Sequence, residues 1–167
     1  MLNTKIEKEI NKQIRLELES AYLYLSMSSY LSDINLNGFA HWMRLQYEEE
    51  QMHAMKMYDY VIERGGRILL EPISAPQHQW ENVVEIFEHT LSHEQSVTAR
   101  INFLVNLAIE ERDHATVNFL QWFIDEQVEE ESSVEELLGQ LRLIEGKGTG
   151  LFMLDREAKM RSNTPLE

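Results

Sequence analysis

Cysteine is absent from this chain of 167 residues, and its absence excludes several kinds of site. Without thiolates the protein cannot build an iron-sulfur cluster, a cysteine-ligated zinc site or a disulfide scaffold. Any bound metal ion must therefore be held by oxygen and nitrogen atoms.

Long apolar runs are also missing. The first ten residues, MLNTKIEKEI, lack the apolar core of a signal peptide, and no stretch approaches the roughly 18 apolar residues that a membrane-spanning helix needs. We therefore expect a cytoplasmic protein without a membrane partner. The length fits a single domain, residues 1–167, that can bury a core without disulfides or structural metals.

Basic residues are scarce relative to acidic ones. The chain has 15 lysines and arginines against 29 aspartates and glutamates, which gives a formal net charge of −14. Such a surface repels nucleic acids and anionic lipids and concentrates cations. We therefore expect cations and no nucleic acid as partners, although an acidic surface also serves solubility alone.

Glycine and proline are few and lie where helices would end, so the chain is predicted to be all-α. Thr4 and Glu7 form a candidate capping box, and Gly65–Gly66 are expected to stop the second helix. The four long helices, which span about residues 4–143, are predicted at 4–33, 39–65, 82–110 and 112–143. Three glycines then precede a short fifth helix at about 151–160.

The segment between the second and third helices, residues 67–81, contains Pro72 and Pro76 and shows little helical period. It is predicted to be a long crossover, whereas the other connections are short. This pattern indicates an antiparallel four-helix bundle in which the second and third helices run in the same direction.

Polar residues interrupt the apolar stripes of the predicted helices. Glu17 lies in the stripe of the first helix, and Glu94 takes the missing place in a seven-residue series between Phe87 and Ile101 on the third. The other two helices carry polar residues on their apolar faces at Gln46, Glu50, His53, Gln127 and Glu130. All four helices are therefore expected to bring polar groups into the core.

The spacing of these residues is regular. A separation of 33 residues joins Glu17 to Glu50 and also Glu94 to Gln127, and a shift of 77 relates the two pairs and carries His53 onto Glu130. The chain is therefore predicted to form two helical hairpins related by a pseudo-twofold axis, with one central site.

Each of these residues alone is a weak signal, because a lone glutamate on a helix is usually solvated. Buried together, four carboxylates would repel and desolvate one another unless cations were bound. Four carboxylates, one imidazole and an amide suit iron or manganese better than copper or structural zinc.

Di-iron carboxylate bundles take one Glu from each of two helices and a Glu-x-x-His pair from each of the others. Here Glu50–His53 is such a pair, whereas Gln127–Glu130 replaces the second one. The chain resembles the bacterial non-haem ferritins over nearly its whole length, in the stretches LELES at 16–20, YEEEQMH at 47–53, HEQ at 93–95, NFLQWF at 118–123 and EQVEE at 126–130.

The resemblance implies a ferritin-like fold and specific roles for these residues. One iron ion would be held by Glu17, Glu50 and His53, with Glu50 bridging to a second ion. The resemblance assigns the second ion to Glu94 and Glu130 with Gln127 close by, Tyr24 to a place beside the pair, and a third ion to Glu49, Glu126, Glu129 and Glu130. Gln51 stands where haem-containing bacterioferritin has its haem methionine, so no haem is expected.

The function implied by the resemblance is oxidation of ferrous iron by dioxygen or hydrogen peroxide, followed by storage as ferric oxide. The store would be a homo-oligomeric cage of about 24 subunits, with the fifth helix as a candidate assembly contact. Two alternatives remain open at this point. One is a di-iron or di-manganese redox enzyme acting on peroxide or an organic substrate; the other is a metal-free helical interaction protein.

Overall fold

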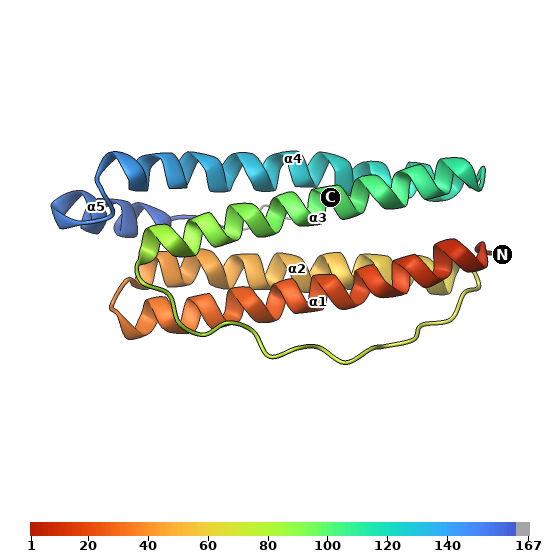
Figure 1. Cartoon of the computed structure of the whole chain (residues 1–167), viewed down its shortest axis with the longest axis horizontal. Coiled ribbons are helices and arrows are strands. Elements are labelled where there is room, and N and C mark those ends of the chain that lie inside the picture. Colours follow the sequence, from red (N-terminus) through yellow and green to blue (C-terminus); the bar gives the residue numbers. More distant parts are fainter. Residues whose placement is uncertain (163–167) are drawn as a thin grey trace.

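The computed structural model describes residues 1–162 of the chain. Its helices are α1 (Thr4–Asp33), α2 (Asn37–Glu63), α3 (Val83–Glu110), α4 (His114–Leu143) and α5 (Gly148–Ala158). Figure 1 shows α1 to α4 lying lengthwise beside one another, with α5 at one end of the bundle. The predicted four-helix bundle with a short fifth helix is confirmed. None of the described helices is both long and apolar enough to cross a membrane.

The direction of each helix follows from the length of its connections. Short turns join α1 to α2 and α3 to α4, so each of these pairs is an antiparallel hairpin. The connection between α2 and α3 runs the full length of the bundle, and α2 and α3 therefore point the same way (Figure 1). The predicted crossover is confirmed.

Side chains of α1 fix the crossover to the bundle. The Asn11 amide accepts a hydrogen bond from the Leu69 backbone N–H at 2.7 Å and donates one to the Arg67 carbonyl at 2.9 Å. Near the other end of α1, the Tyr30 hydroxyl donates to the carbonyl of Trp80, whose side chain is buried. The crossover satisfies part of its backbone on α1 instead of forming secondary structure of its own.

Short polar side chains cap the starts of α1 and α3, and one predicted cap is wrong. Asn3, not Thr4, caps α1: its side-chain oxygen accepts the Lys5 N–H at 2.8 Å, because Asn3 has extended backbone while Thr4 is already helical. Asn82 caps α3, accepting the Glu85 N–H at 3.0 Å.

The second and fifth helices also differ from their predicted bounds. The second begins at Asn37 and ends at Glu63 instead of spanning 39–65, and the fifth occupies Gly148–Ala158 instead of 151–160. The early start of α2 has a tertiary cause, since no side chain of its own turn caps it. Asp155 of α5 does so, because its Oδ1 accepts the N–H groups of Gly38 at 2.8 Å and Phe39 at 3.0 Å.

This cap requires a very close approach between α5 and α2. A Cβ atom at position 38 would lie 1.5 Å from the Asp155 carbonyl oxygen, so only glycine fits at Gly38. Ala158, at the end of α5, is buried against the bundle. The fifth helix is therefore fixed in place against α2.

The apolar core is divided into two clusters. One, at the α5 end, is centred on side chains such as Phe39, Phe87 and Leu138, and the other contains Ile6 and Ile101. Between the clusters every long helix contributes buried polar side chains, namely Glu17, Ser20, Gln46, Glu50, His53, Thr90, Glu94, Gln127 and Glu130. These nine residues are called the polar layer below.

We predict that Asp155→Ala loosens α5 and lowers stability by about 1 kcal/mol, because the N–H groups of Gly38 and Phe39 lose a charged cap. Thermal melts should shift down, and hydrogen exchange in α5 should accelerate. Glu157→Ala removes an exposed carboxylate from the same helix and serves as the control. Equal melting of the two variants would contradict the capping role of Asp155.

Candidate metal centre

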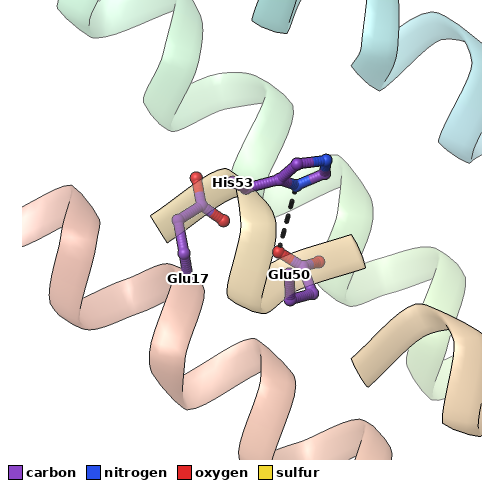
Figure 2. A group of neighbouring side chains, drawn as sticks. All are labelled: Glu17, Glu50 and His53. Atoms are coloured by element: carbon purple, nitrogen blue, oxygen red, sulfur yellow. Dashed lines mark ion pairs between the residues drawn. The ribbon is translucent and has the colours of Figure 1, made fainter. Parts of the chain in front are cut away.

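The tightest group in the polar layer joins α1 and α2. Ligand atoms of Glu17, Glu50 and His53 all lie within 4.8 Å of one another, and each residue is at most 2% exposed. Figure 2 shows that Glu17 comes from one helix, while Glu50 and His53 come from successive turns of its neighbour. Their spacing of three residues places Glu50 and His53 on one face. We call these three residues the inner cluster.

Several atoms of the inner cluster are left without a hydrogen-bond partner. Glu17 Oε2, Glu50 Oε2 and His53 Nε2 are buried and bond to no group within the described part of the chain. His53 Nδ1 lies 3.4 Å from Glu50 Oε2. Unpartnered buried polar atoms are costly, and two carboxylates with an imidazole form the nitrogen and oxygen donor set of a hard or borderline cation. The residues present therefore fit a metal ion.

The carboxylates on the other side of the polar layer do have partners. Glu94 of α3 accepts hydrogen bonds from the Tyr24 hydroxyl and from Gln127 Nε2, the latter at 3.1 Å. Glu130 of α4 accepts one from Gln46 Nε2 at 2.7 Å. The two halves of the layer therefore differ, because among the described residues Glu17 and Glu50 keep buried oxygens without a partner, whereas Glu94 and Glu130 do not.

A second group of potential ligands extends outward from the inner cluster. His53, Glu126 and Glu130 also bring ligand atoms within 4.8 Å of one another, and His53 Nε2 lies 3.8 Å from Glu126 Oε1. The other two residues suggested for a third ion are placed differently. Glu49 is paired with Arg161 at 2.8 Å, whereas Glu129 is exposed and belongs to neither group.

Sequence reasoning overlooked one buried amide, Gln13, which holds a carboxylate of the inner cluster. Gln13 is fully buried, and its Nε2 donates to Glu17 Oε1 at 3.0 Å. Gln13 precedes Glu17 by four residues, so the helical period could have identified it. The ion pair between Arg161 and Glu49 could not be predicted from a helical period, because 112 residues separate the two.

Burial keeps protons on part of the polar layer. Burial, and then the charge of Glu130, raises the pKa of Glu94 from 4.5 to about 8. Burial, and then the charge of Glu49, raises the pKa of Glu130 to about 7. The pKa of Glu50 also lies well above its usual range, mainly through burial, although His53 opposes the rise. Without a cation, the layer therefore limits its negative charge by binding protons.

The pKa of the His53 imidazole is raised by neighbouring charges and not by burial. Burial alone would lower the pKa of His53, but the carboxylates of Glu126 and Glu50 outweigh burial and raise that pKa well above its usual value. The Tyr24 hydroxyl, buried beside Glu94, has a raised pKa and keeps its proton. A metal ion entering the inner cluster must therefore displace a proton from His53.

Comparison with known proteins identifies the family. A family model for the ferritin-like domain matches residues 7–144. A bacterial non-heme ferritin of Bacteroides fragilis is 38% identical over 96% of this chain and 100% of its own length, and one of Staphylococcus saprophyticus is 37% identical over 97% of each. An open pore ferritin from Archaeoglobus fulgidus is 48% identical, with a TM-score of 0.96 over 97% of this chain and 100% of that structure. This chain therefore belongs to the ferritin family.

Proposed function

We propose that this protein is a ferroxidase that oxidises ferrous iron in pairs in its polar layer and stores the ferric product in a homo-oligomeric cage. The observation that carries the proposal is the inner cluster, where unpartnered ligand atoms of Glu17, Glu50 and His53 meet inside the bundle. Membership of the ferritin family supports it.

The first ferrous ion binds at the inner cluster. Glu17 and Glu50 supply negative charge, and His53 supplies a nitrogen ligand once it has lost its proton. A divalent cation at this point offsets the repulsion between buried carboxylates and satisfies their unpartnered oxygens. Binding of the ferrous ion therefore removes the repulsion between carboxylates that is present in the empty layer.

The second ferrous ion binds to Glu94 and Glu130, with Glu50 shared between the ions and Gln127 alongside. Its carboxylates must first give up hydrogen bonds from Gln46 and other donors of the polar layer. The second ion therefore binds more weakly than the first, and oxidation begins only when both positions are filled.

Pairing the ions matters because common oxidants take electrons two at a time. Each ferrous ion gives up one electron, so that a pair reduces dioxygen to hydrogen peroxide, or hydrogen peroxide to water, with uptake of two protons. The ferric ions then move toward the outer carboxylates Glu126, Glu130, Glu49 and Glu129, which form the third position, and on to the store as ferric oxide.

Storage requires an enclosed assembly of about 24 subunits with closed symmetry. Large apolar side chains that lie exposed on the crossover and on α5 support such contacts, among them Leu69, Leu70, Phe152 and Met153. These side chains are exposed, whereas those of the polar layer are buried inside the bundle, so assembly and oxidation use different residues.

We predict that His53→Ala slows ferrous oxidation at least about tenfold, because the inner cluster loses its nitrogen ligand. The size of the assembled particle should not change, since His53 is buried inside one subunit. Stopped-flow absorbance after anaerobic iron loading measures the rate, and size-exclusion chromatography the assembly. His78→Ala, at an exposed position of the crossover, is the control. An unchanged rate in His53→Ala would remove this residue from the site.

The outer carboxylates are tested by their effect on stoichiometry. Changing Glu49, Glu126 and Glu129 together to alanine should leave paired oxidation intact but alter the ratio of iron oxidised to oxygen consumed. Among the single variants Glu126→Ala should have the largest effect, because Glu126 lies beside His53. An oxygen electrode measures this ratio. A triple variant with the parent ratio and turnover would show that the third position has no role.

The metal-free protein should show a specific dependence of stability on pH. The raised pKa values of Glu94 and Glu130 mean that stability is full below their ordinary value of 4.5 and is lost as the pH rises through about 7 and 8. Changing both to glutamine removes this loss, and the amide oxygens can still accept from Tyr24 and Gln46. The variant should melt at least about 4 °C higher than the parent at pH 8, with a smaller difference at pH 5.

Thermal melts of chelator-treated protein between pH 5 and 8 provide this measurement. Glu135→Gln combined with Glu136→Gln, both at exposed positions of α4, controls for the change in net charge. The same double variant should lose rapid iron oxidation. If it melted below the parent at every pH, hydrogen bonding and not charge would dominate the energetics of these two residues.

A further inference from the structure

Arg161 is a charged residue that the proposed function leaves without a role. It lies just beyond α5, in residues 159–162, which we call the C-terminal arm. Its guanidinium Nη2 donates a hydrogen bond to Glu49 Oε2 at 2.8 Å, and the two side chains are only 22% and 14% exposed. Arg161 therefore forms a largely buried ion pair across the surface of the bundle.

The path of the C-terminal arm is well defined. The Asp155 cap holds α5 against the start of α2, and beyond it the Arg161 carbonyl oxygen lies 3.0 Å from His41 Nε2 on the same helix. The guanidinium also lies 4.3 Å from the centre of the Trp42 ring, a cation–π distance. These contacts hold the Arg161 guanidinium group against Glu49 instead of letting it extend into solvent.

The ion pair borders the outer ligand group. The charges of His53 and Glu126 act on Glu49, and those of Glu49 and Arg161 act in turn on Glu130. Arg161 Nη1 is buried and has no hydrogen-bond partner within the described part of the chain. Arg161 thus brings a fixed positive charge to the carboxylates where a third metal ion would bind.

We propose that Arg161 is a tethered cation that competes with metal ions for Glu49, so that filling the outer position displaces the C-terminal arm. This inference rests on the proposed function, which assigns Glu49 to that position. Arginine stays charged at every physiological pH, so the pair does not open by deprotonation. A competing cation opens it, and the outer position accepts iron only when the iron concentration is high enough to displace the arm.

The test uses zinc, which binds to nitrogen and oxygen ligands without redox chemistry. Assembled, metal-free parent and Arg161→Gln protein are titrated with Zn²⁺, and crystals soaked at increasing Zn²⁺ are compared by anomalous scattering. We expect Arg161→Gln to fill the outer position at about two- to fivefold lower Zn²⁺, as befits a partly exposed ion pair. Inner-cluster occupancy should stay the same. Arg156→Gln removes an exposed arginine of α5 and should match the parent.

Two further variants separate charge from packing. Arg161→Lys keeps the charge and should fill the outer position at nearly the parent Zn²⁺ concentration. In a Glu49→Gln background, Arg161→Gln should have no further effect. If Arg161→Gln bound Zn²⁺ at the outer position no more tightly than the parent, or if Arg161→Lys behaved like Arg161→Gln, competition by Arg161 would be disproved. Absence of Zn²⁺ from Glu17, Glu50 and His53 in every variant would instead contradict the proposed function.

Discussion

Burying several carboxylates at one level of a helical bundle is the constraint on which the rest of this structure depends. Glu17, Glu50, Glu94 and Glu130 are each at most 5% exposed, although isolated ionised carboxylates are among the most costly groups to remove from water. The protein can tolerate them only by supplying protons, hydrogen-bond donors or cations. Protons and hydrogen-bond donors serve Glu94 and Glu130, and the cationic side chain of Arg161 serves the neighbouring Glu49.

The apolar part of the fold is arranged around this constraint. One hydrophobic cluster lies on each side of the polar layer, and both contain fully buried aromatic or branched side chains such as Phe87 and Ile101. Their burial offsets the unfavourable energy of the layer between them. The long crossover contributes as well, because it allows two antiparallel hairpins to face each other with their polar residues at the same level.

Negative charge is neutralised in different ways in the inner and outer parts of the site. Glu94 retains a proton and accepts hydrogen bonds from Tyr24 and Gln127, whereas the inner cluster presents unpartnered atoms. At the outer edge Glu49 is neutralised by an arginine from the far end of the chain. Under the proposed function, the inner cluster would accept the first cation, because its ligand atoms include buried ones without a hydrogen-bond partner in the described part of the chain.

The sequence by itself determined which residues are helical and which polar residues face inward. The 3.6-residue period fixes the face on which Glu17, Glu50, His53 and Glu94 lie, and the Pro-containing crossover fixes the direction of α3. The burial of all four residues agrees with that reading. Helix ends were less predictable: Asn3 rather than Thr4 caps α1, since two adjacent residues both had suitable side chains.

Only the tertiary structure decided how the carboxylates are partnered. The cap of Gly38 by Asp155, the hydrogen bond from Gln46 to Glu130 and the ion pair of Arg161 with Glu49 join residues 84 to 117 positions apart. Such contacts depend on the rotation and axial shift of one helix relative to another. A local period does not encode those quantities, because they are set by the packing of the whole core.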